Sequence, residues 1–253
     1  MSSRDYAEPS AKAGGSGLGV ASRLIGRPRI PILYYHEIGT ERGRHVVHPD
    51  DFAAQVQWLV EDGFEILTMD AVAELYEGRR KPPRRPLALT FDDGRRGVLE
   101  HALPVLVHHR IPATCYVVTD WLEGRSIPEH ERYSGFLEWG ALDELLGGGM
   151  AVGSHTLSHR NLKKIPAHEV WREVADSRRL LEDRLARPVP HFSFPSGRSP
   201  REVVRAVRRA GYRTAVATGQ RSNGPFARIH RLRRLRVDGS GGPGELQRLL
   251  GDS

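Results

Sequence analysis

The stretch Leu87-Ala88-Leu89-Thr90-Phe91-Asp92-Asp93-Gly94 is an apolar run that ends in two adjacent carboxylates and a glycine. The run predicts a buried strand, with Asp92 and Asp93 just beyond its C-terminal end. In parallel α/β folds, ligands bind and chemistry takes place at this end of the strands. Neighbouring side chains of an extended chain point in opposite directions, so one carboxylate can bind a cation while the other faces a substrate. The alternative is a plain strand followed by an Asp-Gly turn.

Predicted strands and helices alternate on both sides of this stretch, with short connections. The other predicted strands span residues 30–35, 64–67, 113–118, 150–153, 191–194, 213–217 and 229–237. This alternation is typical of a mostly parallel α/β sheet. About seven such units in a chain of this length fit a closed or nearly closed barrel better than an open sheet.

The chain of 253 residues is long enough for one domain of this kind and a tail. Residues 1–26 are polar and predict a flexible N-terminal tail, which leaves residues 27–253 as the catalytic domain. The tail lacks the apolar segment of a secretory signal, and no apolar run is long enough to span a membrane. We therefore expect a cytoplasmic protein without stable membrane insertion. The single cysteine, Cys115, suits a reducing compartment and predicts a core residue.

The formal net charge is +7, and arginines are densest between residues 228 and 236. A basic surface can attract nucleic acid or an anionic membrane. The sequence has no zinc-finger or helix-turn-helix pattern and no aromatic residues interleaved with the basic ones. We therefore expect no nucleic-acid partner. A solvated basic surface is the simpler interpretation, and an anionic substrate is left open.

Other chemically active side chains fall at the ends of other predicted strands. His36 follows strand 30–35, His155 and His159 follow strand 150–153, and Pro195-Ser196-Gly197 follows strand 191–194. In a parallel barrel all of these positions meet at the same face as the two aspartates.

The spacing of His155 and His159 would direct both imidazoles the same way if they lay on one helical turn. Two histidines and one carboxylate, with open positions for water, are typical of a catalytic metal site. Asp93 can supply the carboxylate, which leaves Asp92 free to act as a base on water acidified by the metal. Two surface histidines are the alternative for this spacing.

Three motifs resemble those of the polysaccharide deacetylase family, also called the NodB-homology domain or carbohydrate esterase family 4: Thr90-Phe91-Asp92-Asp93-Gly94, Gly153-Ser154-His155-Thr156-Leu157-Ser158-His159 and Phe194-Pro195-Ser196-Gly197. Shorter matches are Leu33-Tyr34-Tyr35-His36, Ala102-Leu103-Pro104-Val105-Leu106 and Pro112-Ala113-Thr114. The resemblance implies a distorted (β/α)7-type barrel. It also implies a hydrolase that removes an acetyl group from an N-acetylated amino sugar.

The resemblance assigns roles to individual residues. Asp93, His155 and His159 would bind one divalent metal ion, commonly Zn²⁺, with Co²⁺ and Ni²⁺ as alternatives. Asp92 would be the general base that takes a proton from metal-bound water, and the backbone N–H of Ser196 would stabilise the oxyanion.

The general acid departs from the common pattern. Most members have a catalytic histidine after a C-terminal strand, but none follows Leu232-Arg233-Arg234-Leu235-Arg236-Val237, and His230 precedes it. His36 has the right placement at the end of the first strand. This resembles the subgroup of poly-N-acetylglucosamine deacetylases whose histidine motif lies near the N-terminus. His36 is therefore the predicted acid, and a structural histidine at the barrel rim is the alternative.

A second departure concerns the arginine that many members have before the proline of the third motif. Phe192-Ser193-Phe194 stands there instead, so what orients Asp92 is open, with Arg198 and Lys163 as candidates. Trp121 is predicted to contact the substrate, because aromatic faces suit the apolar faces of sugars. Tyr35 and Pro195 are predicted substrate contacts as well. Tyr116 is predicted to be a core residue.

The leading hypothesis is thus a metal-dependent deacetylase of an N-acetylated carbohydrate, either a polysaccharide or a small glycoside. An O-acetyl esterase acting on carbohydrate would use the same chemistry. A non-catalytic carbohydrate-binding protein on the same fold is a third possibility. The sequence leaves the substrate, the physiological metal and the oligomeric state open.

Overall fold

The structure, a computed structural model, describes residues 29–251 apart from residues 42, 44, 130–134, 220, 240 and 241. The predicted tail, residues 1–26, lies outside the described residues. Within the described part of the chain, no helix is both long and apolar enough to cross a membrane.

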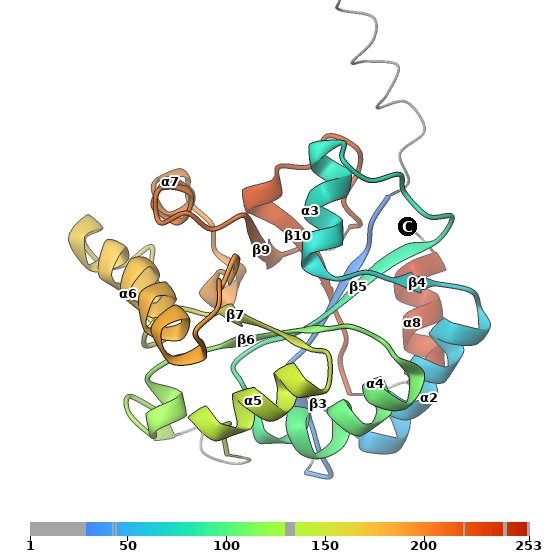
Figure 1. The fold of residues 1–253 in the computed structure, drawn as a ribbon. Helices are drawn as coiled ribbons and strands as arrows, with labels where there is room; N and C mark the ends of the chain where they lie inside the picture. Colours follow the sequence, from blue (N-terminus) through green and yellow to red (C-terminus); the bar gives the residue numbers. More distant parts are fainter. Residues whose placement is uncertain are drawn as a thin grey trace, which may run out of the picture.

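Parallel strands form a closed barrel at the centre of the molecule (Figure 1). Its seven strands are β1 (Ile32–Tyr35), β5 (Pro86–Phe91), β6 (Thr114–Val117), β7 (Ala151–Ser154), β8 (His191–Ser193), β9 (Thr214–Thr218) and β10 (Leu232–Arg236). The ring closes because β1 pairs with β5 on one side and with β10 on the other. The predicted barrel is therefore confirmed.

Short strands extend the barrel at two places. β4 (Glu65–Ile66) pairs with the first residues of β5, which come before the residues of β5 that pair with β1. β2 (Glu37–Ile38) and β3 (Val46–Val47) form a separate parallel pair directly after β1. This small pair lies beside His36 and so shapes the rim of the barrel.

Helices surround the barrel (Figure 1). They are α2 (Pro49–Glu61), α3 (Met69–Glu77), α4 (Leu103–His109), α5 (Trp139–Gly147), α6 (Ala167–Leu185), α7 (Arg201–Arg209) and α8 (Gly242–Gly251). Shorter helical segments are η1 (Val98–Ala102), η2 (Trp121–Glu123), η4 (Pro195–Gly197) and η5 (Ile229–Arg231). The buried face of α6 carries Val170, Val174 and Leu181, as the spacing of its apolar residues predicts.

The start and end of α3 show how the sequence sets helix boundaries. The Thr68 hydroxyl accepts a hydrogen bond from the backbone N–H of Ala71 at 3.0 Å and so caps the first turn. Gly78 ends the helix with φ 76°, a left-handed conformation that glycine adopts without steric cost.

The prediction that Tyr35 contacts substrate is wrong. Tyr35 is fully buried in the layer between β1 and α2, where its hydroxyl donates to Gln55 Oε1 at 3.0 Å. Its ring packs against Phe52 and Phe91, with ring centroids 5.3 and 5.5 Å away. Successive side chains of a strand point to opposite faces, so it is Tyr34 that faces the barrel interior.

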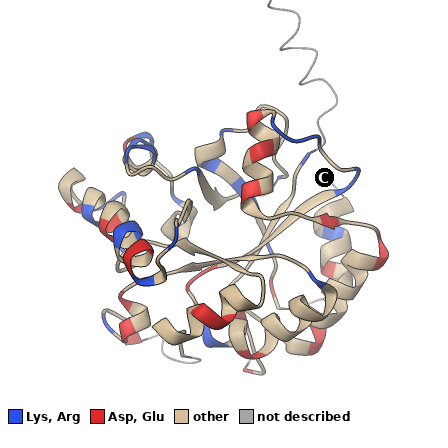
Figure 2. Ribbon diagram, in the orientation of Figure 1, with Lys and Arg blue, Asp and Glu red and all other residues tan. Residues whose placement is uncertain are grey.

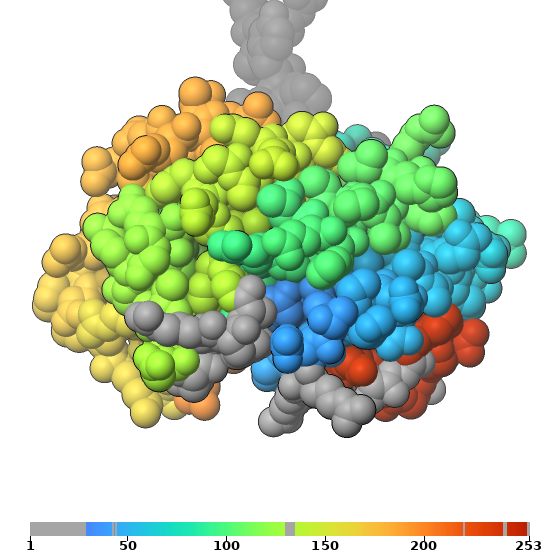
Figure 3. All heavy atoms as spheres, turned by 90° about the horizontal axis from the view of Figure 1, so that it is seen from below, coloured from blue at the N-terminus to red at the C-terminus, as the bar shows by residue number. Residues whose placement is uncertain are grey.

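Gln55 links this layer to the end of the chain. Its side-chain amide donates to the carbonyl of Gly242 at 3.0 Å, at the start of α8. Figure 3 shows red α8 beside light-blue α2 on the surface of the molecule. The tyrosine, the glutamine and the C-terminal helix therefore form one connected part of the core.

We expect Tyr35→Phe to lower the free energy of unfolding by about 1 kcal/mol, because the substitution leaves the buried Gln55 carbonyl without its donor. Urea denaturation followed by circular dichroism measures this change. An unchanged free energy of unfolding would contradict the structural role of the hydroxyl.

Candidate active site

The C-terminal ends of the barrel strands surround a cavity of about 260 Å³. The predicted residues that line it come from four different strand ends: His36, Asp92, Asp93, His155, His159 and Ser196. Tyr34, His45, Arg95, Gly197, Thr218 and Arg236 complete its wall. The convergence expected from strand ends alone is therefore present in the structure.

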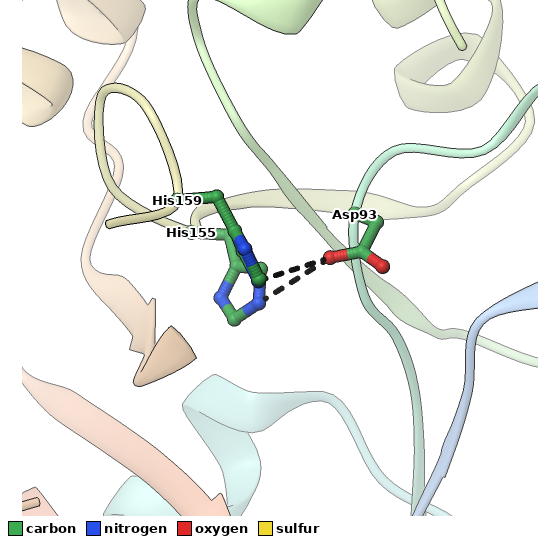
Figure 4. A group of neighbouring side chains, drawn as sticks. All are labelled: Asp93, His155 and His159. Atoms are coloured by element: carbon green, nitrogen blue, oxygen red, sulfur yellow. Dashed lines mark ion pairs between the residues drawn. The ribbon is translucent and has the colours of Figure 1, made fainter. Parts of the chain in front are cut away.

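Three residues in this cavity could hold a metal ion (Figure 4). Asp93 Oδ1 lies 3.5 Å from Nε2 of His155 and 3.5 Å from Nε2 of His159. The same Asp93 oxygen is buried and has no hydrogen-bond partner among the described residues. Two imidazoles and a carboxylate around an unsatisfied buried oxygen fit a divalent cation.

The environment of His155 leaves one of its ring nitrogens able to bind a cation. Burial lowers the pKa of His155 to about 4, so its imidazole is neutral at neutral pH and has a free lone pair. Its Nδ1 lies 2.9 Å from the carbonyl oxygen of Ser193, which holds the ring and leaves Nε2 directed toward Asp93. A second hydrogen bond of this kind orients metal-binding histidines in general.

The residues between the two histidines do not form the helical turn that their spacing suggested. Thr156 and His159 have φ values of 72° and 60°, in the left-handed region, and the segment is an irregular loop. The Thr156 hydroxyl oxygen accepts from the His159 N–H at 3.0 Å, and the Ser154 hydroxyl oxygen accepts from the Thr156 N–H at 3.2 Å. The side chains of Ser154 and Thr156 thus satisfy backbone N–H groups that carbonyls would satisfy in a helix.

Glu173 of α6 anchors the same loop from outside the barrel. Its buried carboxylate accepts hydrogen bonds from the backbone N–H groups of Leu157 and Ser158 at 3.1 and 2.9 Å, and from the Ser158 hydroxyl. Sequence reasoning did not predict this residue. It fixes the loop that presents His159.

Strained backbone is concentrated at the cavity. Of the seven non-glycine residues with positive φ in the described chain, four belong to the motifs: Asp93, Thr156, His159 and Ser196. Each such conformation costs about 1–3 kcal/mol and persists where the surroundings enforce it. The cluster of strain therefore marks this rim as the functional part of the barrel.

Asp92 is held by Arg234, which projects from β10 into the barrel. Arg234 is fully buried, and its two terminal nitrogens lie 2.7 and 2.6 Å from the two Asp92 oxygens. The guanidinium also donates to the hydroxyls of Thr90 and Ser193, at 3.2 and 2.9 Å. The Tyr34 ring lies beneath it, with its centroid 4.4 Å from the guanidinium carbon.

Arg234 is therefore the residue that orients Asp92. The two candidates predicted from the sequence, Arg198 and Lys163, are wrong. Arg198 lies in a neighbouring groove and Lys163 is exposed on the loop before α6. Alternation along strand 232–236 was the missed signal: Leu232 and Arg234 are buried, whereas Arg233 is exposed. An arginine facing into a barrel needs a buried anion as its partner.

The ion pair also sets the charge of Asp92. Burial alone would raise the pKa of the Asp92 carboxyl, but Arg234 and the neighbouring imidazoles outweigh it and hold the pKa well below its usual range. Asp92 is therefore an ionised, rigidly oriented carboxylate at neutral pH.

His36 lies on the same cavity, at the end of β1. Its ring packs against His45, with centroids 4.7 Å apart, and against Tyr34 at 5.4 Å. Its Nδ1 is buried and has no hydrogen-bond partner among the described residues. The structure thus presents His36 to the cavity rather than tying Nδ1 to the rim.

Two predicted substrate contacts are wrong because the residues are buried behind the cavity wall. Trp121 is only 2% exposed, and its ring centroid lies 5.1 Å from that of His159, so it supports the loop of the histidine. Pro195 is buried, and the residues after it, Ser196 and Gly197, line the cavity instead. The backbone of Ser196, with φ 55°, places that residue at the rim.

Arg95 is a further cavity residue that sequence reasoning missed. It is buried, its guanidinium lies over the Phe136 ring at 4.4 Å, and its Nη2 is 4.0 Å from Asp93 Oδ2. It thus faces the carboxylate oxygen that does not contact the imidazoles.

A family model of polysaccharide deacetylases matches residues 79–215. The chain belongs to the polysaccharide deacetylase family. The matched segment includes the Asp-Asp and His-x-x-x-His motifs and the third motif around Ser196, so the family resemblance and the enzyme class, a deacetylase-type hydrolase, are confirmed.

Known relatives agree with this placement in the family. The chain is 29% identical to the Bacillus subtilis (strain 168) protein YxkH, which is named for the same family, over 81% of this chain and 71% of that protein. It is 21% identical to a poly-beta-1,6-N-acetyl-D-glucosamine N-deacetylase of Staphylococcus aureus (strain MRSA252), over 81% and 72%. The fold matches the Streptococcus pyogenes deacetylase PplD, solved in complex with acetate, with a TM-score of 0.79 and 24% identity over 88% of this chain and 98% of that one.

We expect Arg234→Met to lower the free energy of unfolding by about 3–5 kcal/mol, because it leaves the Asp92 carboxylate buried without a partner. Arg233→Gln, one residue away on the exposed face, is the matched control and should change stability by less than about 0.5 kcal/mol. Chemical denaturation of both variants measures the difference. Equal stabilities would contradict the ion pair.

The ion pair also predicts a pH dependence of stability. Asp92 has a lower pKa in the folded than in the unfolded chain, so its contribution is complete above the unfolded value, about 4, and is lost as pH falls below it. Denaturation at a series of acidic pH values should show a shallower loss of stability in Arg234→Met than in the natural chain. Parallel slopes would contradict the assignment.

We expect about one divalent ion per chain after incubation with zinc and removal of the excess. Asp93→Asn and His155→Gln should each weaken zinc binding by at least about tenfold, because each removes or weakens one of three ligands. Calorimetry and elemental analysis measure this, with the exposed His168→Gln on α6 as the control. Zinc binding that is equal in all variants would contradict the site.

Proposed function

We propose that this chain is a metal-dependent hydrolase that removes the acetyl group from an N-acetylated amino sugar. The observation that carries the proposal is one cavity in which a metal-binding cluster lies beside the ionised, arginine-held carboxylate of Asp92. The similarity to a poly-N-acetylglucosamine N-deacetylase supports an N-acetyl group as the target.

Asp93, His155 and His159 would hold one divalent ion, with Zn²⁺ the first choice for two imidazoles and a carboxylate, and Co²⁺ or Ni²⁺ as alternatives. When bound, such an ion lowers the pKa of water and polarises the acetyl carbonyl.

Asp92 serves as the general base in this proposal. Arg234 holds both of its oxygens, so the carboxylate keeps one orientation toward the cavity and cannot turn away. It stays ionised at neutral pH and can accept a proton from the attacking water. The buried guanidinium of Arg234 fixes the position of the Asp92 carboxylate but lowers its basicity. The main contribution of Arg234 is therefore to orient Asp92.

His36 serves as the general acid. An amide nitrogen leaves only when it is protonated, so hydrolysis of an acetamide needs a proton donor on the leaving-group side. His36 faces the cavity from β1, a different strand from the one that carries Asp92. The backbone N–H of Ser196 would donate to the developing oxyanion from the third motif.

An O-acetyl esterase would use the same residues. An alkoxide leaves more readily than an amide anion, so an ester substrate depends less on the acid. The effect of removing His36 therefore separates the two reactions. A purely carbohydrate-binding role is disfavoured because every residue of the proposed machinery is present and lies on one cavity.

We expect acetate release from a hexamer of N-acetylglucosamine by the zinc-loaded chain. Asp92→Asn and His36→Ala should each lower kcat/KM by about 10²–10⁴-fold, the usual contribution of a general base or acid. Both variants should keep the zinc, since neither residue belongs to the metal cluster. An enzymatic acetate assay measures the rates, with His168→Ala as the control.

Two results would contradict this account. Zinc binding without acetate release would remove the deacetylase function, and full activity of His36→Ala on the amide would remove His36 as the acid. A loss confined to the amide, with an aryl acetate ester still hydrolysed, would support its role in protonating the amine.

A further inference from the structure

A groove of about 720 Å³ adjoins the active-site cavity. Gly197 and Thr218 line both hollows, so the groove begins where the cavity ends. Its wall carries four exposed arginines and, among the described residues, no carboxylate: Arg198, Arg228, Arg231 and Arg233. We call it the arginine groove.

The four arginines of the groove belong to the most basic segment of the chain. Residues 198–236 contain twelve arginines and one acidic residue, Glu202, whereas the net charge of the chain is +7. The rest of the chain is therefore slightly acidic. Figure 2 shows blue segments on α7 and in the region of η5 and β10, and mixed red and blue elsewhere. Three arginines of this segment, Arg213, Arg234 and Arg236, form ion pairs with acidic residues, whereas the four of the groove contribute a basic wall beside the active-site cavity that no carboxylate among the described lining residues compensates.

The wall of the groove is built before any ligand arrives. The Asn223 side chain donates to the carbonyls of Ile30 and Arg233, at 3.2 and 2.7 Å, and accepts from the Arg233 N–H at 2.7 Å. Arg231 Nε donates to the Ser199 hydroxyl at 2.9 Å, which fixes its side chain. A site whose donors are already held costs less conformational entropy on binding.

An aromatic side chain completes the groove. Phe226 is 77% exposed and lines it together with the arginines. An exposed aromatic ring suits the apolar face of a sugar, and guanidinium groups suit carboxylates and phosphates.

We propose that the arginine groove binds an anionic unit, bearing a carboxylate or a phosphate, of the same glycan whose acetamide enters the active-site cavity. The proposal rests on the proposed deacetylase function for that cavity and names its substrate class. Deacetylation leaves an ammonium group, so a wholly neutral substrate becomes cationic and is repelled by four arginines. A glycan with anionic units next to its N-acetylated ones is attracted before and after the reaction.

Binding is tested separately from catalysis, by calorimetry on the zinc-loaded His36→Ala chain, which turns substrate over slowly. The first probe is a hyaluronan hexasaccharide, in which N-acetylglucosamine alternates with glucuronate. Its neutral match is the same hexasaccharide with the carboxylates reduced to alcohols. An oligomer of N-acetylglucosamine joined by phosphodiesters tests phosphate as the anion, and a double-stranded oligonucleotide tests nucleic acid as the occupant.

We expect the better of the two anionic glycans to bind at least about tenfold more tightly than the neutral hexasaccharide. Arg231→Gln with Arg233→Gln should remove most of this difference, at roughly two- to fivefold for each exposed arginine. Arg172→Gln with Arg179→Gln, two exposed arginines on α6, removes the same charge away from the groove and should have little effect.

Equal binding of charged and neutral glycans would overturn the proposal, as would an equal loss in the α6 control. Tighter binding of the oligonucleotide than of both anionic glycans would reassign the groove to nucleic acid. Charge-selective binding without acetate release from any glycan would support the groove as an anion site and contradict only the deacetylase function. Acetate release without charge-selective binding would support the deacetylase function and contradict the anion site.

Discussion

The buried ion pair between Asp92 and Arg234 is the constraint on which the rest of the site depends. It joins β10 to the residue that follows β5 across the barrel interior, and the hydroxyls of Thr90 and Ser193 accept further hydrogen bonds from the two terminal nitrogens of its guanidinium. Two charges removed from water are tolerated only when they are paired and well bonded. The barrel therefore has a polar centre directly beneath its reactive rim.

The ion pair connects fold and chemistry. Because Arg234 occupies the interior below Asp92, the next residue, Asp93, is free to face the two imidazoles with an otherwise unsatisfied oxygen. Asp93 has a positive φ of 72°, so the backbone leaves the extended strand conformation between the two carboxylates. In the proposed mechanism, the carboxylate that is paired with the arginine acts as the base, and the other would help to hold the cation that activates water.

Much of this arrangement could be predicted from sequence because strand ends of a parallel barrel meet at one face. His36, Asp92, Asp93, His155, His159 and Ser196 were placed by that rule, and all line one cavity. The rule does not state which way a side chain points within a strand. The rule therefore predicts that Tyr35 contacts substrate, although alternation along β1 puts its side chain in the core. Alternation along β10 is likewise what places Arg234 inside the barrel, and the position of a strand end does not reveal it.

The conformation of the loops could not be predicted from the sequence, for a different reason. The spacing of His155 and His159 fits a helical turn, but side-chain hydrogen bonds of Ser154 and Thr156 and the distant Glu173 hold a left-handed loop instead. Trp121 lies in a segment with no periodicity, and its burial against His159 depends on contacts far apart in sequence. Such contacts are fixed by tertiary packing, which local patterns do not contain.

The most direct test of this account is a double-mutant cycle on the pair, with Asp92→Asn, Arg234→Met and both together, read as the free energy of unfolding. A buried, mutually dependent pair predicts that the double variant loses clearly less than the two single losses combined, with a coupling of at least about 1–3 kcal/mol. Additive losses would show that the two residues do not form the pair on which the site is built.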